Sequence, residues 1–126
     1  MKASEMSRRH GELCPLDTTL KILDGKWKSI ILCRLMKHDF RYTELLRTLP
    51  GCTRRMLSLQ LLQLETDRII IKQTDTSYVP VKTSYRLTSA GRSLVPIILA
   101  MNKWGAAYLK RLIPVGESEI SEVRND

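Results

Sequence analysis

Arginine and hydroxyl side chains gather in one short segment of this sequence, just after a proline-glycine turn. They are Thr53, Arg54, Arg55 and Ser58, and Thr53 is a suitable N-cap for a helix over residues 53–67. An arginine can donate two hydrogen bonds to guanine in the major groove of DNA, and a helix N-terminus favours a nearby phosphate. The chemistry that these side chains suit is recognition of DNA.

The leucines of the same segment decide which of its side chains face outwards. Leu57, Leu61 and Leu64 form one narrow inward stripe on a helical wheel. The side chains that point away from this stripe are Arg55, Ser58, Leu59 and Leu62, with Arg54 on the flank. We expect Leu59 to contact a thymine methyl group, and Leu62 to pack against a neighbouring hairpin or helix.

Other side chains are candidates for contacts with the DNA backbone. Thr43, with Arg41 beside it, stands at the expected start of a short helix and can donate to phosphate oxygens. Tyr78 and Lys82 lie in an expected hairpin loop, from which they can reach a minor groove or its phosphates. Such contacts position a protein on DNA and make binding fall steeply with salt.

Periodicity places these residues on a framework of helices and strands. The expected helices are 15–23, 26–37, 42–49, 53–67 and 88–112, and expected strands at 69–71 and 83–87 enclose a loop at 75–82. This order is that of the winged helix-turn-helix, in which the hairpin loop is the wing. The predicted fold class is α+β, mostly α, with extra N- and C-terminal helices for dimerisation. Gly91 and Pro96 are expected to bend the last helix.

Length and charge limit what this framework can do. The 126 residues are enough for one modest core, so we expect a single domain over 1–126, with its core at about 14–112, an arm at 1–12 and an acidic tail at 115–126. The net charge of +8 favours a polyanionic partner.

Several classes of function are disfavoured. The longest apolar stretch, 93–102, is too short to span a membrane, and no leader opens the chain, so we expect a cytoplasmic protein with no membrane partner. His10 and His38 have no metal-binding spacing. Paired carboxylates, a nucleophile with its base and a phosphate-binding glycine loop are all missing. We expect no enzyme, no metal and no cofactor.

A series of short motifs runs along the chain from Cys14 to Gly105. They are Cys14-Pro15, Gly25-Lys26-Trp27, Tyr42-Thr43-Glu44-Leu45, Thr53-x3-Leu57-x3-Leu61-x2-Leu64-Glu65, Val79-Pro80, Tyr85-x-Leu87-Thr88-x2-Gly91 and Trp104-Gly105. Each motif is weak alone, but their order and spacing are specific. In these motifs the chain resembles the HxlR family of bacterial winged-helix regulators. The resemblance implies a homodimer that binds double-stranded DNA at a pseudo-palindromic operator.

The last helix supports a dimer independently. It carries an extended apolar stripe that one small winged domain has little core to bury. The stripe comprises Leu94, Ile97, Ile98, Met101, Trp104, Tyr108 and Leu112. Ordinary packing within the chain is the alternative for some of these side chains.

The chain departs from the family pattern at two positions. Arg68 stands where the family has glycine after the reading helix; either Arg68 adopts the left-handed conformation or the helix ends differently. Val81 replaces a second proline in the wing, which affects the expected shape of that loop.

Many HxlR relatives respond to oxidants or electrophiles through a cysteine near the N-terminus, and the resemblance matches Cys14 to it. Cys14 stands at an expected helix N-terminus, whose partial charge stabilises a thiolate. The alternative is a small apolar residue packed at the helix start. Cys52 precedes the reading helix, and a Cys14–Cys52 disulfide between subunits is a hypothesis. Cys33 is expected to be a buried, inert thiol.

The sequence thus predicts a homodimeric, sequence-specific DNA-binding transcriptional regulator that responds to a small oxidant or electrophile through Cys14. Two alternatives remain open. One is a winged-helix regulator without thiol sensing, controlled by abundance or by a ligand in the dimer cleft. The other is a basic architectural protein that binds DNA without sequence preference.

Overall fold

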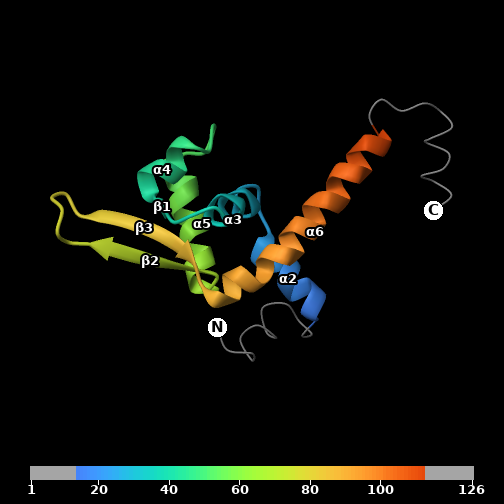
Figure 1. Cartoon of the computed structure of the whole chain (residues 1–126), viewed down its shortest axis with the longest axis horizontal. Helices are drawn as coiled ribbons and strands as arrows, with labels where there is room; N and C mark the ends of the chain where they lie inside the picture. Colours follow the sequence, from blue (N-terminus) through green and yellow to red (C-terminus); the bar gives the residue numbers. More distant parts are fainter. Residues whose placement is uncertain (1–13, 113–126) are drawn as a thin grey trace. The chain divides into compact units, whose positions relative to one another are not determined.

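The computed structural model describes residues 14–112, which form helices and one small sheet (Figure 1). The elements are α2 (Pro15–Leu23), α3 (Lys28–Leu35), β1 (Phe40–Arg41), α4 (Tyr42–Arg47), α5 (Arg54–Thr66), β2 (Ile70–Asp75), β3 (Lys82–Leu87) and α6 (Ser89–Leu112). The chain divides into two compact units between Ser93 and Leu94. The expected arm at 1–12 and acidic tail at 115–126 lie outside the described residues.

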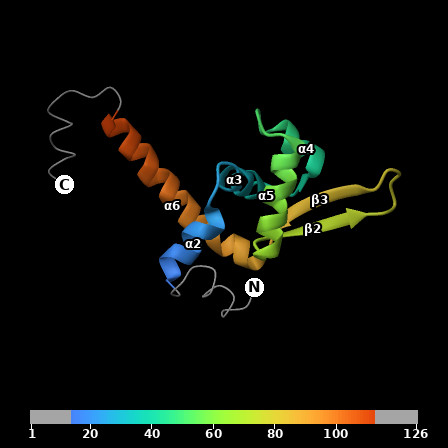
Figure 2. The same cartoon turned by 180° about the vertical axis from the view of Figure 1, so that it is seen from behind.

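The fold class is the predicted one, a mostly helical α+β fold of the winged helix-turn-helix type with a long C-terminal helix. Its sheet is antiparallel with the order β1-β3-β2. Ile70 pairs with Leu87 at one end of the β2–β3 hairpin and Asp75 with Lys82 at the other. The hairpin extends beyond α4 and α5 in both views (Figures 1 and 2), and its loop at 76–81 is the wing.

The strand β1 is not predicted by any sequence pattern. It is only two residues long, too short for any periodicity to show. Its existence depends on pairing with β3, where Phe40 lies opposite Tyr85. Phe40 is buried, so this short pairing also anchors the segment that leads into α4.

The core of the first unit is built on the leucine stripe of α5. Leu57, Leu61 and Leu64 are buried, as their spacing predicts. They are joined in this core by apolar side chains from every neighbouring element: Ile31, Leu32, Leu35, Phe40, Leu45, Leu49, Ile69, Ile70, Tyr85 and Leu87. Because one face of α5 is wholly committed to the core, its rotation is fixed and its polar face must point outwards.

Both ends of α5 are defined by specific hydrogen bonds. Thr53 is its N-cap, and the Thr53 hydroxyl accepts a bond of 3.1 Å from the Met56 amide. After the helix, Arg68 has a φ of 60°. The Arg68 amide donates to the Glu65 carbonyl and the Ile69 amide to the Leu64 carbonyl, which is a Schellman motif. Of the two alternatives left open for Arg68, the left-handed conformation is therefore the one adopted.

The start of α6 packs closely on the end of α5. The Thr88 hydroxyl donates to the Arg68 carbonyl at 2.7 Å and accepts from the Gly91 amide at 3.0 Å. A Cβ atom on Gly91 would collide with the Ile69 carbonyl oxygen. Gly91 is thus required for this close approach, and α6 runs through it and through Pro96 as one continuous helix. None of the helices described is long and apolar enough to cross a membrane.

Candidate nucleic-acid interface

The predicted DNA-reading side chains share one exposed face of α5. Arg54, Arg55, Ser58 and Leu59 are all exposed, and they occupy the first two turns after the Thr53 cap. The first turn of a helix presents unpaired amide groups and a partial positive charge. This end of α5 therefore combines cationic side chains, hydroxyl groups and a positive backbone end on one surface.

Tyr42, which the sequence marks as a helix start and as part of a family motif but not as a site residue, is bonded to this face. Its hydroxyl donates to the Arg54 carbonyl at 3.1 Å and lies 2.9 Å from the Ser58 hydroxyl. The Arg54 guanidinium carbon lies 5.9 Å from the centre of the Tyr42 ring, within range of a cation–π contact. Tyr42 therefore fixes both the backbone and a side chain of the reading face. No local pattern could reveal a contact between residues sixteen positions apart.

The wing is held by contacts with side chains of the strands at its base. Asp75 accepts hydrogen bonds from the Ser77 amide at 3.0 Å and from the Ser77 hydroxyl at 2.6 Å, and these bonds lower the pKa of Asp75. The Lys82 ammonium lies 3.8 Å from the centre of the Tyr78 ring, and the Arg41 guanidinium lies 6.0 Å from it. Tyr78 thus gathers two cations at the base of the wing.

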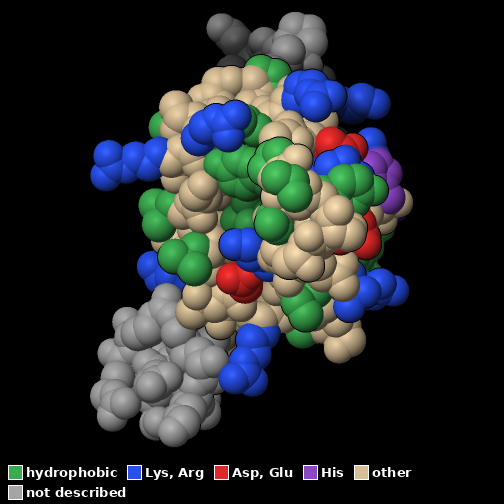
Figure 3. All heavy atoms as spheres, turned by 90° about the vertical axis from the view of Figure 1, so that its left-hand side faces the viewer, with side chains coloured by type: hydrophobic (Ala, Val, Ile, Leu, Met, Phe, Trp, Pro, Cys, Tyr) green, Lys and Arg blue, Asp and Glu red, His purple; other side chains and the backbone are tan. Residues whose placement is uncertain are grey.

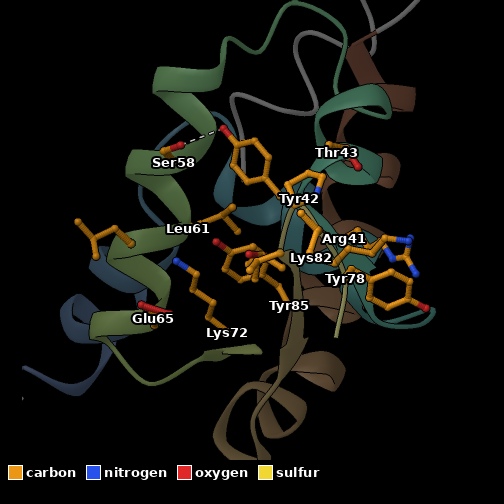
Figure 4. A pocket seen from close by; sticks show the side chains of 15 residues that line it. Arg41, Tyr42, Thr43, Ser58, Leu61, Glu65, Lys72, Tyr78, Lys82 and Tyr85 are labelled. Carbon is orange, nitrogen blue, oxygen red and sulfur yellow. Dashed lines mark hydrogen bonds between the residues drawn. The ribbon is translucent and has the colours of Figure 1, made fainter. Parts of the chain in front are cut away.

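A cleft of about 870 Å³ separates the reading helix from the wing (Figure 4). One wall is α5, the opposite wall is the wing, and Tyr85 lies on its floor. Its lining residues are Arg41, Tyr42, Thr43, Ser58, Leu61, Leu62, Glu65, Lys72, Tyr78, Val79, Pro80, Val81, Lys82, Thr83 and Tyr85. The predicted phosphate contacts Thr43, Tyr78 and Lys82 therefore lie on the same cleft as Ser58 of the reading face.

The cleft also corrects the expectation for Leu62. This side chain is 58% exposed, so neither the hairpin nor a helix covers it as predicted; it lines the open cleft instead. Burial raises the pKa of Tyr85, and the nearby Glu65 carboxylate raises it further. Figure 3 shows the molecule from the side of the wing, with hydrophobic side chains in the middle of this face and Lys and Arg side chains around them.

The cysteines differ in their surroundings. Cys14 is exposed and is the N-cap of α2, with Pro15 in the first turn, as predicted. Cys52 is half-buried, and its thiol donates to the Thr53 carbonyl at 3.6 Å. Burial raises the pKa of Cys52, and the charge of Lys26 opposes that effect. Cys33 is half-buried as well, so the expectation of a buried thiol is wrong in part. Arg8, Arg9 and His10, the basic neighbours of Cys14 in sequence, lie outside the described residues.

The stripe on α6 divides into buried and exposed side chains. Leu94 and Ile98 are buried, whereas Ile97, Met101, Trp104, Tyr108 and Leu112 are exposed. Trp104 is 69% exposed, and its ring stacks on Tyr108 with the ring centres 5.2 Å apart. Further exposed apolar side chains on this helix, outside the stripe, are Leu99 and Leu109.

Comparisons with known proteins decide what kind of protein carries this face. The model of the HxlR-like helix-turn-helix family matches residues 22–112, well over half of the chain. The chain belongs to the HxlR family. It is a helix-turn-helix transcriptional regulator and not an enzyme. The HTH-type transcriptional regulator YdeP of Bacillus subtilis is 45% identical over 101 residues, which are 80% of this chain and 78% of YdeP.

Solved structures of two other transcriptional or redox regulators share the fold. The redox regulator HypR in its reduced form superposes with a TM-score of 0.71 at 40% identity, covering 75% of this chain and 92% of HypR. The reduced form of the transcriptional regulator YodB from Bacillus subtilis has a TM-score of 0.66 at 30% identity, covering 73% of this chain and 90% of YodB.

Proposed function

We propose that this HxlR-family regulator binds a pseudo-palindromic operator as a homodimer, reads it with the N-terminal half of α5, and changes its affinity when Cys14 is oxidised. The observation that carries the proposal is the Tyr42 contact with α5. Tyr42 holds Arg54 and Ser58 at the exposed, positively charged end of a helix whose opposite face is fully buried. Such preorganised, outward-facing donors and acceptors suit the major groove.

The contacts with DNA divide into base reading and backbone positioning. Arg54 and Arg55 can each form two hydrogen bonds with guanine, and Leu59 suits a thymine methyl group. Thr43, Tyr78 and Lys82 line the cleft beside α5, where a DNA strand that leaves the major groove would present its phosphates. Arg41 is held near Tyr78 and would add a phosphate contact.

The proposed dimer uses the exposed apolar face of α6. The exposed members of the predicted stripe are Ile97, Met101, Trp104, Tyr108 and Leu112. Burial of such side chains is the main favourable term in association. Leu94 and Ile98 are already buried in the chain, so we assign them to its own packing. A two-fold axis would place the two reading helices about 34 Å apart, one turn of DNA.

The thiol response is proposed for Cys14 because it is the exposed cysteine and caps a helix N-terminus. Related structures support this choice: HypR is solved in its reduced and oxidised forms, and YodB is solved reduced and after diamide treatment. In the proposed step two thiols join in a disulfide, and their two hydrogens pass to an azo oxidant such as diamide. Cys52 is the proposed second thiol, on the partner subunit.

A gel-shift titration of operator DNA with reduced and diamide-treated protein tests the proposal. We expect oxidation to change the operator affinity of the wild type, and we expect Cys14→Ser to remove that change while leaving the reduced affinity intact. Cys33→Ser is the matched control and should respond like the wild type. An unchanged response in Cys14→Ser would favour a regulator without Cys14 sensing, and equal affinity for operator and random DNA would favour an architectural protein.

A further inference from the structure

The Tyr42 hydroxyl stands between two oxygen atoms of the reading helix. One is the carbonyl oxygen of Arg54, 3.1 Å away, and the other is the hydroxyl oxygen of Ser58, 2.9 Å away. Figure 4 shows Tyr42 reaching across the head of the cleft to Ser58. Three oxygen atoms at these distances must share the available protons, and the number of protons decides which groups can still bond to DNA.

The cluster has two hydroxyl protons, one from Tyr42 and one from Ser58. Only one arrangement lets both of them form a hydrogen bond. A carbonyl oxygen can only accept, so the Tyr42 proton goes to Arg54; otherwise two oxygen lone pairs would face each other at 3.1 Å. The second bond must then be donated by Ser58 to the Tyr42 oxygen. Among the described residues, no other hydrogen bond is formed by the Ser58 hydroxyl.

This arrangement gives the exposed side of Ser58 a single polarity. Because the Ser58 hydroxyl proton is engaged in the hydrogen bond to the Tyr42 oxygen, the Ser58 oxygen presents only lone pairs to solvent. In the major groove, adenine and cytosine present an amino donor, whereas guanine and thymine present acceptors at O6 and O4. An oxygen that presents only lone pairs can bond to the amino group of adenine or cytosine, and it is repelled by the acceptor oxygen of guanine or thymine. It is equally unsuited to a phosphate oxygen, which is also an acceptor.

We propose that Tyr42 is a specificity-determining residue. By accepting the hydrogen bond that the Ser58 hydroxyl donates, Tyr42 makes Ser58 select adenine or cytosine at one base pair of each operator half-site. This inference rests on the proposed reading of DNA by α5. It does not depend on Cys14 or on the nature of any effector. Tyr42 itself touches no base in this proposal and acts by positioning Ser58 and fixing its proton.

The variant Tyr42→Phe tests the inference because it removes one oxygen and little else. The phenyl ring keeps the stacking surface for Arg54, and the Arg54 carbonyl keeps its bond within the helix. The Ser58 proton becomes free to face DNA, so Ser58 can both donate and accept. We expect the wild type to prefer adenine or cytosine at one position by about three- to tenfold, the value of one net hydrogen bond, and Tyr42→Phe to lose most of that preference.

Two control variants separate base selection from a general loss of structure. Thr66→Val removes a hydroxyl from the other end of α5, where it donates to the Leu62 carbonyl, and should keep the wild-type base preference. Ser58→Ala should lose the preference as well, and adding Tyr42→Phe to it should change nothing further. That non-additivity is expected only if Tyr42 acts through Ser58.

The measurement is a panel of operators, each with one base pair replaced, titrated with each variant at one salt concentration. The inference is supported if Tyr42→Phe flattens the preference at a single position per half-site and leaves the other positions alone. A uniform loss of affinity at every position, or a profile equal to the wild type, overturns the inference but not the proposed function. A wild type without any base preference overturns both.

Discussion

The helices α5 and α6 both expose large side chains, but they do so in opposite ways. On α5 the exposed face is polar at its N-terminal half and is held by neighbours: Thr53 caps the helix, and Tyr42 bonds to Arg54 and Ser58. On α6 the exposed face is apolar. Trp104 on this face stacks on Tyr108 of the same helix. One helix is organised by its own chain, whereas the other presents an apolar surface that favours a protein partner.

This difference assigns different physical forces to the two helices. Binding through α5 would depend on charge and hydrogen bonds, and would weaken as salt rises. Association through α6 would depend on apolar burial and on protein concentration. Variants on the two helices should therefore lose function in distinguishable ways.

The largest effect is expected from Trp104→Glu on α6. Burying a charged side chain in the centre of an apolar dimer interface carries a large free-energy cost because the charge loses its contact with water. The variant should therefore be monomeric. With two half-sites no longer linked, operator affinity should fall by about 10²- to 10⁴-fold. Analytical ultracentrifugation and gel shifts measure the two effects. Because Trp104 is 69% exposed in the chain, the fold should persist.

The control for that variant is Lys103→Glu, which places a glutamate at an exposed position on the side of α6 opposite the stripe. It lies outside the apolar stripe and should leave the dimer intact. If Trp104→Glu sediments as a dimer, the proposed interface is wrong, whatever its effect on DNA binding.

A smaller effect, confined to DNA, is expected from Arg55→Ala on α5. Loss of an arginine that bonds to guanine should cost about 1–3 kcal/mol, roughly ten- to a hundredfold in operator affinity. The dimer should be unaffected. Arg86→Ala removes an exposed arginine of β3 and should bind almost like the wild type. Equal losses for the two variants in a gel shift would mean that only total charge matters.

The sequence predicts most of α5 because its determinants are local. The spacing of Leu57, Leu61 and Leu64 predicts the buried face, and Thr53 predicts the cap; both are confirmed. The conformation of Arg68 stayed open because the family pattern and the residue disagree. The φ of 60° resolves it, since the backbone requirement at this helix end outweighs the preference of arginine.

The features that the sequence could not predict all depend on contacts between distant segments. The strand β1 exists through its pairing with β3, and the Tyr42–Ser58 bond joins the start of α4 to the second turn of α5. The raised pKa of Cys52 depends on how the turn before α5 is packed. Periodicity and capping rules describe neighbours along the chain, so they contain no information about such contacts.

Arg68→Gly tests how firmly the C-terminal end of α5 is fixed. A non-glycine residue in the left-handed region carries a cost of about 1–2 kcal/mol, which the substitution by glycine relieves. The larger conformational entropy of glycine in the unfolded state offsets part of this stabilisation. The variant should therefore be more stable by about 0.5–1 kcal/mol in urea unfolding. A destabilised Arg68→Gly would show that the arginine side chain contributes a contact that outweighs the backbone strain.

The smallest effect concerns the turn that leads into α5 and is read from thiol reactivity in single-cysteine variants. The thiolate is the form that reacts with iodoacetamide. Because burial raises the pKa of Cys52, its thiolate fraction at neutral pH is lower than that of an ordinary thiol. Its alkylation rate should therefore still be rising at pH values where an ordinary thiol has levelled off. Mass spectrometry should find that Cys52 reacts several-fold more slowly than the exposed Cys14 in the native protein, and at a similar rate in guanidinium chloride. Equal native rates would mean that the turn opens often enough to expose Cys52, and α5 would then be less firmly held at its start than at its end.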